Sequence, residues 1–314
     1  MIGRDSHVLV TGGAGFIGSH LVEHLVSAGA RVTVIDNFST GRMDHLQALL
    51  PQLELIVGDL SDVLGLERVN IDDYEYVFHL AANPYIPPSV EDPRFDFHAN
   101  LSNTFNLLEA LRHADRKPRL VNISSAAVYG NPARLPIAET DPTVPISPYG
   151  VSKLAGERYA EVYSRIYGLR TTSLRLFSVY GPRQRKQVVF DLLLRLRADP
   201  TRLVVLGDGS QVRDFVYVLD VVQAAMLAAS VAPGQGECYN VASGTTHSIR
   251  QLVAAWCDVC GLTPEVVYTG QVRPGDAEKW SVDITSLERL GFKPMTNLTA
   301  GLVAIRDWYD TITR

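Results

Sequence analysis

The chain has 314 residues, of which 46% are hydrophobic, and carries a formal net charge of −5. This composition supports a large core shared by two lobes, and the acidic balance gives no electrostatic case for a nucleic-acid partner. No apolar run approaches the ~20 residues of a membrane span, and the first residues lack the apolar core of an export signal.

The predicted fold begins with a strand, a glycine turn and a helix. Residues 7–10 predict a buried parallel strand, and apolar residues recur at helical spacing from Phe16 onward. Between them, Gly13-Ala14-Gly15-Phe16-Ile17-Gly18 fits G-x-G-x-x-G, whose glycines turn the chain sharply and let its backbone approach a pyrophosphate. A second strand at 31–35 ends in Asp36, where a ribose-binding acid is expected. Its charge would repel a 2′-phosphate, so NAD is favoured over NADP.

Strands and helices alternate through the rest of the first half. Further strands are expected at 53–57, 76–80, 119–123 and 171–176, with helices near 97–112 and 148–167. Apolar strands alternating with helices predict a Rossmann-type, doubly wound parallel sheet covered on both faces. Ligands of such sheets bind beyond the carboxyl ends of the strands. The residues at these ends are Gly13, Asp36, Asp59, Ala81, Ser125 and Phe177.

The regular alternation stops after Gly181-Pro182. A helix at 188–197 and a strand at 203–206 come next, and a strand at 215–218 with a helix at 221–229 is expected to return to the first domain. The remainder, with a strand at 266–268 and a helix near 299–309, suits a second, smaller α/β substrate lobe. We therefore expect an NAD-binding domain of residues 1–176 plus about 212–240. The nucleotide-sugar lobe, whose ligand is argued below, would comprise about 177–211 and 241–314.

Cys257 and Cys260 form a Cys-x-x-Cys, but they fall in a predicted helix. Ser248 is placed to cap that helix and Gly261 to end it, and no thioredoxin-like strand precedes the motif. Neither a redox nor a metal role is expected. Three cysteines cannot build a disulfide framework, so we expect a cytoplasmic protein.

Tyr149 and Lys153 are spaced to share one face at the start of the helix near 148–167. A nearby ammonium and the positive ring of an oxidised nicotinamide would both favour a tyrosine phenolate. That phenolate could accept a hydroxyl proton while a hydride leaves the same carbon. Ser125, at the end of the neighbouring strand, could share and orient that proton. We predict Tyr149, Lys153 and Ser125 as the catalytic set.

Motifs in family order run along nearly the whole chain. They are Thr11–Leu21, Asp36-Asn37, Gly58-Asp59-Leu60, His79–Ala82, Ser124–Gly130, Tyr149–Lys153, Gly181–Arg183, Arg213–Val216 and Arg273–Asp276. On these residues the chain resembles the extended short-chain dehydrogenases/reductases of the nucleotide-sugar epimerase and dehydratase family, most like UDP-glucose 4-epimerase.

The resemblance implies NAD as cofactor and a nucleotide-sugar, most often a UDP-sugar, as substrate. The implied cofactor-binding residues are Gly12, Gly13, Gly15, Phe16, Ile17, Gly18, Asp36, Asn37, Asp59, Leu60, Leu80, Ala81, Ala82, Asn100, Tyr149 and Lys153. Asp59 and Leu60 would flank the adenine, and Asn100 would support the nicotinamide side. The implied substrate-binding residues are Ser125, Ser178, Arg185, Arg213, Arg273 and Asp276. His79 is expected to be a packed strand-end histidine, and no metal is expected.

Members of the family begin by oxidising a sugar hydroxyl to a ketone. Dehydratases then use an acid pair after a threonine, but here Ala126-Ala127 follow Ser125, and neither can move a proton. Only return of the hydride remains, so we predict a 4-epimerase of a UDP-hexose, of the glucose/galactose type. Ser178 and Arg185 also resemble residues of UDP-glucuronate 4-epimerases, and GDP-, CDP- and dTDP-sugars remain open. The alternative from another class is a catalytically silent NAD-binding regulatory protein.

Two further expectations concern the sugar and the assembly. Trp280, from its position in the last motif, is expected to face the sugar and to disfavour N-acetylated substrates. The helices near 97–112 and 148–167 carry extra apolar positions, and the family often pairs such helices across a two-fold axis. These positions are Leu101, Phe105, Leu108, Ala155, Val162 and Tyr163. A homodimer is predicted.

Overall fold

A seven-stranded parallel sheet forms the centre of the computed structural model, which describes residues 2–61, 68–271 and 280–313. The strand order is β10-β6-β5-β4-β1-β2-β3, and every neighbouring pair is parallel. This contains the 3-2-1-4-5-6 order of a dinucleotide-binding fold, with β10 added beyond β6. The predicted Rossmann-type sheet is confirmed.

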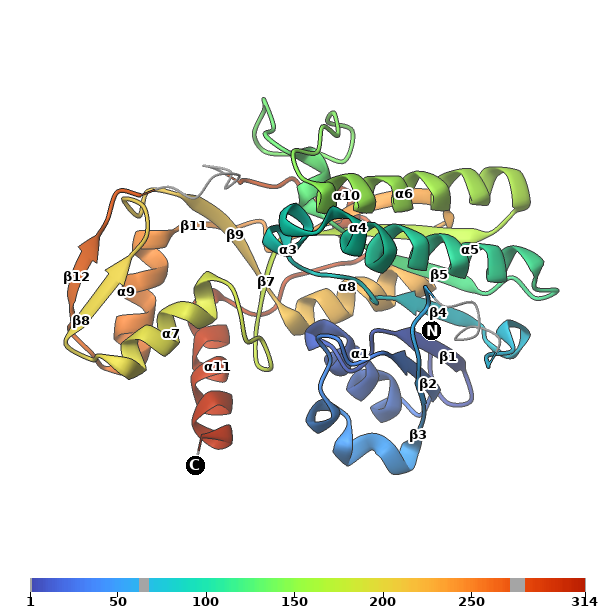
Figure 1. The fold of residues 1–314 in the computed structure, drawn as a ribbon, viewed down its shortest axis with the longest axis horizontal. Coiled ribbons are helices and arrows are strands. Elements are labelled where there is room, and N and C mark those ends of the chain that lie inside the picture. Colours follow the sequence, from blue (N-terminus) through green and yellow to red (C-terminus); the bar gives the residue numbers. More distant parts are fainter. Residues whose placement is uncertain (1, 62–67, 272–279, 314) are drawn as a thin grey trace.

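Helices cover both faces of this sheet (Figure 1). The strands are β1 (His7–Thr11), β2 (Arg31–Asp36), β3 (Leu53–Val57), β4 (Tyr76–His79), β5 (Arg119–Ser125), β6 (Arg170–Leu176) and β10 (Gln235–Val241). One face carries α3 (Ile86–Glu91), α4 (Pro93–Asp96), the π-helix η4 (Phe97–Ser102), α5 (Asn103–His113) and α6 (Pro148–Tyr167). The other carries α1 (Phe16–Ser27) and α8 (Val218–Ser230). Short 3₁₀ turns are η1 (Met43–His45), η2 (Gln47–Gln52), η3 (Ile71–Asp73) and η5 (Ala126–Tyr129).

The second, smaller α/β lobe is also present. Its sheets are β11-β9-β7, formed by β7 (Ser178–Tyr180), β9 (Val212–Tyr217) and β11 (Thr246–Ser248), and β12-β8, formed by β8 (Arg202–Val205) and β12 (Glu265–Tyr268). Its helices are α7 (Val188–Ala198), α9 (Ile249–Cys260) and α11 (Leu298–Ile312), while α10 (Thr285–Glu288) packs against β10. One hydrophobic cluster runs from Val8 and Val222 to Trp256 and Leu302, so the lobe and the main sheet share a core.

Four strands differ from the prediction: the short strands β7 and β11 were not expected, and β9 and β10 differ as follows. The strand expected at residues 215–218 exists as β9, but it pairs with β7 and β11 instead of joining the main sheet. The seventh strand of that sheet is β10, which the sequence analysis missed. Its first half is polar and only partly buried, because it lies at the sheet edge and lacks the apolar run of a central strand. The helix expected at 221–229 is α8, which packs on β5 and β6. The division of the chain into domains stays a prediction.

The Cys-x-x-Cys lies on α9, as predicted. Ser248 and Gln251 form a capping box at its start, and Gly261 ends it in the left-handed conformation. All three cysteines of the chain are free thiols.

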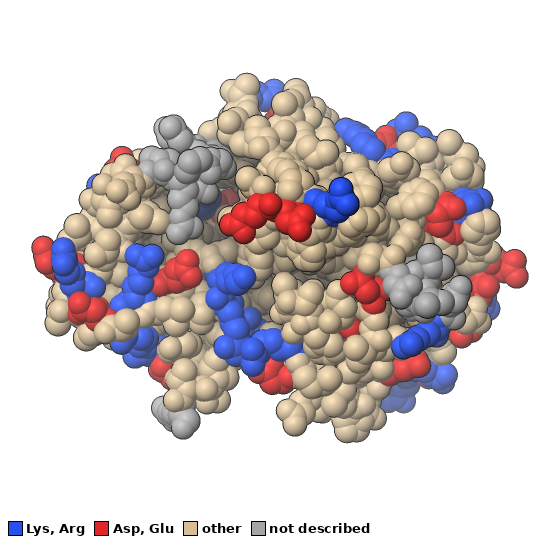
Figure 2. All heavy atoms as spheres, in the orientation of Figure 1, with Lys and Arg blue, Asp and Glu red and all other residues tan. Residues whose placement is uncertain are grey.

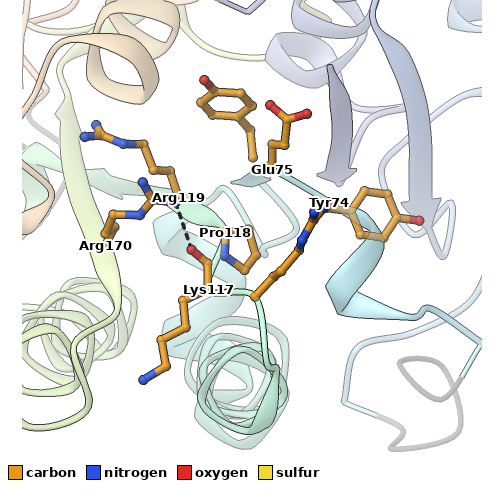
Figure 3. A pocket seen from close by; sticks show the side chains of 8 residues that line it. Tyr74, Glu75, Lys117, Pro118, Arg119 and Arg170 are labelled. Atoms are coloured by element: carbon orange, nitrogen blue, oxygen red, sulfur yellow. Dashed lines mark hydrogen bonds between the residues drawn. The ribbon is translucent and has the colours of Figure 1, made fainter. Parts of the chain in front are cut away.

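A cavity of about 450 Å³ opens at the amino-terminal edge of the main sheet (Figure 3). Arg119 and Arg170, the first residues of β5 and β6, line it together with Lys117. Arg119 Nη1 donates to the Ala232 carbonyl oxygen at 2.7 Å, and Lys117 Nζ donates to the Tyr167 carbonyl oxygen. Arg170 Nη2 donates to the Lys117 carbonyl oxygen at 3.0 Å. These cations hold carbonyl groups at and just after helix ends, a structural role.

An ion pair is buried between α6 and β6. Arg175 Nη2 lies 2.8 Å from Glu157 Oε2, and the two side chains are 2% and 5% exposed. Ser124 Oγ donates to Glu157 Oε1 at 2.5 Å, and Arg175 Nη1 donates to the Tyr129 hydroxyl at 2.8 Å. The pair therefore fastens α6 to the carboxyl ends of β5 and β6. Removing one charge would leave the other buried without a partner.

Replacing Glu157 by Gln should lower the free energy of unfolding by about 3–5 kcal/mol, because Arg175 would remain as an uncompensated buried cation. Urea denaturation followed by circular dichroism measures the loss. The double variant Glu157→Leu/Arg175→Met should lose less than Glu157→Gln alone. Glu161 on the same helix, which pairs with the more exposed Arg158 and Arg165, is the control. Glu161→Gln should cost under about 1 kcal/mol, and equal losses at the two sites would contradict the prediction.

Candidate active site

The glycine turn after β1 is too tightly packed for side chains. A Cβ on Gly12, whose φ is +72°, would lie 2.6 Å from the Ala81 nitrogen, and one on Gly18 would lie 2.2 Å from the Gly12 carbonyl oxygen. The Ala81 N–H donates to Thr11 Oγ1 at 3.3 Å, which joins the turn to the end of β4. Helix α1 then begins at Phe16. Such a turn lets a phosphate approach free backbone N–H groups.

The remaining residues predicted to bind the cofactor belong to the same region. They lie in the turn, in the first turn of α1 or just after β3 and β4: Gly13, Gly15, Ile17, Leu60, Leu80 and Ala82.

Asp36 stands at the end of β2 beside the turn. Its buried carboxylate accepts from the Ala14 N–H and from the Phe38 N–H, both at 2.8 Å. Burial raises the pKa of Asp36. Asn37 Nδ2 donates to Asp59 Oδ2 at 2.7 Å. The residues predicted to hold the ribose and to flank the adenine are therefore neighbours.

Tyr149, Lys153 and Ser125 meet where β5 ends and α6 begins. Tyr149 and Lys153 are one helical turn apart, and the Ser125 side chain at the end of β5 is near enough to the Tyr149 hydroxyl to lower its pKa against the effect of burial. Ser125 Oγ also accepts from the Ala127 N–H at 3.2 Å, and Lys153 Nζ donates to the Ile123 carbonyl oxygen at 3.0 Å. Burial raises the pKa of Tyr149 to about 12 and lowers that of Lys153 to about 8. Burial thus pushes both groups toward their neutral forms.

Asn100 lies in the π-helical turn η4 and is buried. Its Nδ2 donates to Asp96 Oδ1 at 2.7 Å, while its Oδ1 has no hydrogen-bond partner in the part of the chain that the structure describes. A buried acceptor of this kind suits a donor from a bound molecule. With the glycine turn and Asp36, it makes a set that fits NAD. Asp96 was missed, although an acid one helical turn before Asn100 was a readable signal.

The predicted substrate residues are only partly brought together. Ser178 begins β7, and Arg213 lies on β9, which pairs with β7. Arg213 Nη1 donates to the Val212 carbonyl oxygen at 2.9 Å. Arg273 and Asp276 lie outside the described residues. The roles predicted for all four residues stay predictions.

Arg185 belongs to a loop that spans the two lobes. Its guanidinium lies 5.5 Å from the centroid of the Trp308 ring on α11 and is exposed. The neighbouring Lys186 Nζ lies 4.4 Å from the Tyr85 ring centroid, in the loop after β4. Gln187 ends the loop with φ +74° and ψ 165°, a backbone conformation that strains any residue other than glycine. Arg185 thus stacks on the C-terminal helix.

Trp280 lies at the carboxyl end of β6. Its ring meets Phe177 edge to face at 5.3 Å between centroids, and its backbone N–H donates to the Val212 carbonyl oxygen at 3.1 Å. The indole Nε1 is buried and has no hydrogen-bond partner among the described residues. Its predicted contact with the sugar stays a prediction.

His79 is a packed histidine, as predicted. Its ring nitrogens meet the hydroxyls of Thr11 at 2.8 Å and Thr104 at 3.0 Å, and burial lowers its pKa to about 3. Among the described residues, no three His, Cys, Asp or Glu side chains gather in a way that could hold a metal ion. Within the same residues, none of the helices is both long and apolar enough to cross a membrane.

The molecular surface is notched between the lobe that carries α11 and the part that carries α1 and β3 (Figure 2). On the face shown, basic and acidic side chains are interspersed. The glycine turn, Asp36 and the Tyr149 set all belong to the carboxyl edge of the main sheet. This arrangement suits hydride transfer coupled to proton transfer.

Known proteins resemble this chain over nearly its whole length. Residues 9–304 match the family of GDP-mannose 4,6 dehydratase. A UDP-glucose 4-epimerase of Mycolicibacterium smegmatis is 36% identical over 312 residues, which cover 96% of this chain and 97% of that protein. The Thermotoga maritima UDP-glucose 4-epimerase with UDP-glucose has a TM-score of 0.91 at 34% identity, covering 98% of this chain and 100% of that one. The Thermus thermophilus UDP-glucose 4-epimerase complex with NAD has a TM-score of 0.87 at 38% identity, covering 97% and 99%.

Replacing Gly18 by Ala should reduce the affinity for NAD by about tenfold or more, which corresponds to 1.4 kcal/mol of clash in the turn. NAD released by acid from the purified protein and assayed enzymatically gives the bound fraction, and titration gives the affinity. Gly3→Ala is the matched control, because nothing lies within 4 Å of a Cβ there. Full NAD occupancy in Gly18→Ala would refute the assignment of the turn.

Proposed function

The chain belongs to the nucleotide-sugar epimerase and dehydratase family of extended short-chain dehydrogenases/reductases, and we propose that it is an NAD-dependent 4-epimerase of a UDP-hexose. The observation that carries this proposal is that Tyr149, Lys153 and Ser125 meet where β5 ends and α6 begins, with two alanines directly after Ser125. The similarity of the chain to UDP-glucose 4-epimerases over nearly its whole length supports a substrate of the glucose/galactose type.

The chain's own residues handle the proton. Bound NAD supplies the acceptor for the C4 hydride and later its donor. Tyr149 Oη, as phenolate, takes the proton of the C4 hydroxyl and returns it in the reverse direction. The Lys153 ammonium, one helical turn from Tyr149, stabilises the phenolate, because a nearby positive charge favours the ionised form of tyrosine. Ser125, at the end of β5 beside Tyr149, orients the sugar hydroxyl for this transfer.

The fate of the ketone follows from Ala126 and Ala127. Elimination would need an acid and a base near C5 and C6, and alanine supplies neither. The hydride therefore returns to C4. When the keto-sugar turns over within the pocket, the hydride reaches the opposite face, so C4 is inverted and NAD is regenerated.

Contacts in the second lobe favour a neutral hexose. A UDP-glucuronate epimerase would need a cation for the sugar carboxylate, and Arg185 is the proposed candidate. Arg185 instead stacks on Trp308. Arg213 and Arg273 are proposed to hold the diphosphate, because a guanidinium fork suits phosphate oxygens. Asp276 is proposed to hold the nucleoside, and Ser178 to lie beside the sugar or phosphates.

A homodimer through α5 and α6 completes the proposal. Exposed apolar side chains line one stripe of α6, and Phe105 of α5 meets Tyr159 edge to face at 5.4 Å. The members of the α6 stripe are Val151, Tyr159, Val162 and Ile166. Leu108 and Tyr163, which we expected on this surface, are buried beneath it instead. Two copies related by a two-fold axis would cover the stripe with itself.

A cytoplasmic location is also part of the proposal. It is supported by the three free thiols, since disulfides are rare in a reducing compartment.

The purified protein should interconvert UDP-glucose and UDP-galactose without uptake of solvent deuterium at carbon, because the same hydride returns. Chromatography of products formed in D₂O measures the conversion, and mass spectrometry of the same products measures deuterium uptake. A panel of UDP-glucuronate and GDP-, CDP- and dTDP-sugars tests the alternative substrates. Tyr149→Phe should lower kcat by about 10²–10⁴ with NAD still bound. Tyr159→Phe, an exposed tyrosine on the same helix, should be near normal. Bound NAD that no sugar ever reduces would favour a regulatory protein.

Val162→Glu should convert the dimer to monomer, because it buries a carboxylate at a self-paired apolar surface. Light scattering after size exclusion gives the mass of each species. Val231, at 53% exposure against 44% for Val162, lies outside the stripe, and Val231→Glu should leave the mass unchanged. A wild-type protein that runs as a monomer would exclude the proposed pairing.

A further inference from the structure

Asp96, the last residue of α4, is a fully buried carboxylate that the mechanism above does not use. No Lys or Arg nitrogen of the described chain lies within 4.0 Å of it. A buried carboxylate without an ion-pair partner is unfavourable unless hydrogen bonds compensate. Three side chains do so: Asn100 Nδ2 donates at 2.7 Å, Ser152 Oγ at 2.8 Å and Asn83 Nδ2 at 3.1 Å.

These three donors come from three elements that converge on the catalytic set. Asn83 lies in the loop after β4, Asn100 in η4, and Ser152 in α6 directly before Lys153. The Tyr149 N–H is held from the same side, by Ser89 Oγ at 3.2 Å. Asp96 is therefore the acceptor shared by the segments that carry Lys153 and Asn100.

The hydrogen bond to Asn100 determines how its amide is turned. A carboxylate accepts and cannot donate, so Asp96 selects the orientation in which Nδ2 faces it. That orientation leaves Asn100 Oδ1 buried with no partner among the described residues. The acceptor is thus available for a hydrogen bond from a bound molecule.

The charge of Asp96 acts on both groups: it opposes the effect of burial on the pKa of Lys153, and it raises the pKa of Tyr149. The charged and titratable groups facing Lys153 are Asp96 from α4, Glu157 and Tyr149 from α6 and His79 from β4. Glu157 is paired with Arg175, and burial keeps both Tyr149 and His79 neutral near pH 7. Of these four groups, Asp96 alone brings a negative charge without a cation of its own.

We propose that Asp96 is a positioning residue of the catalytic centre, whose carboxylate keeps Lys153 charged and turns Asn100 Oδ1 toward the cofactor. This inference rests on the proposed function for its effect on turnover. Burial lowers the pKa of Lys153 to about 8, and Asp96 and Glu157 oppose that shift. Without the Asp96 charge, the pKa of Lys153 falls further and the ammonium is lost at lower pH.

The test is Asp96→Asn, with Asp96→Ser as a second variant that leaves room for water. Asp92→Asn is the matched control, because Asp92 is an exposed acid of the same segment that caps α4 through the Phe95 N–H at 2.9 Å, and asparagine also caps helices. The chain has five lysines, so ¹³C-labelled lysine NMR resolves Lys153, assigned with Lys153→Met. Titration of its ε-carbon signal gives its pKa without any sugar present.

In Asp96→Asn the acid dissociation constant of the Lys153 ammonium should rise by about tenfold or more, so its pKa falls. Tenfold is the low end of the effect expected from losing a nearby opposite charge. With the UDP-hexose substrate, kcat should fall by about 10–10² while KM stays within about twofold, since the sugar contacts are untouched. The alkaline limb of the pH–rate profile should move to lower pH by the same amount as the NMR titration. Asp92→Asn should change none of these values.

An unchanged Lys153 titration in Asp96→Asn would overturn the proposal, as would a loss of folding in both variants, because Asp96 would then serve stability alone. If the Lys153 titration shifts but no nucleotide-sugar is converted by wild type, the proposed function fails and the charge relation stands. If wild type is an epimerase but the Lys153 titration does not shift in Asp96→Asn, the proposed function stands and the role of Asp96 fails.

Discussion

The proposed mechanism requires opposite charges on Tyr149 and Lys153, two side chains that are buried together where α6 begins. Exclusion of water raises the pKa of Tyr149 to about 12 and lowers that of Lys153 to about 8, so burial alone would favour two neutral groups. A neutral phenol cannot take a proton from a sugar hydroxyl, and a neutral amine cannot stabilise a phenolate. The site depends on nearby charges and hydrogen bonds that reverse the effect of burial. Asp96 opposes the effect of burial on the pKa of Lys153, and Ser125 opposes it on the pKa of Tyr149, whereas the charge of Asp96 adds to the effect of burial on Tyr149.

The parallel sheet is what brings this set to one place. In a parallel sheet every strand ends at the same edge, so the glycine turn, Asp36, Ala81 and Ser125 reach it from four different strands. Helix α6 begins at that edge and supplies Tyr149 within its first turn. The opposite edge instead carries cations that bind helix-end carbonyl groups. The common direction of the strands thus places the proposed site residues at one edge of the sheet and the cations that bind helix-end carbonyl groups at the other.

Features set by neighbours along the chain could be predicted from the sequence. The glycine turn, the span of α6 and the capping of α9 by Ser248 each depend on residues a few positions apart, and all are present. Features set by distant partners were missed. The pairing of β9 with β7 and β11, and the contact of Asp96 with Ser152, join residues far apart in the chain. Such contacts leave no periodic trace in the sequence.

One close contact beside Tyr149 is made with backbone atoms of η5. A Cβ on Gly150, the next residue, would lie 2.6 Å from the Ala127 carbonyl oxygen, so α6 rests directly on the main chain of η5. The side chains at 126 and 127 do not enter this contact. A family that includes dehydratases and epimerases can therefore keep one proton-transfer geometry while those two positions carry acids or alanines. Here they carry alanines, and the same frame leaves the ketone no route except back to an alcohol.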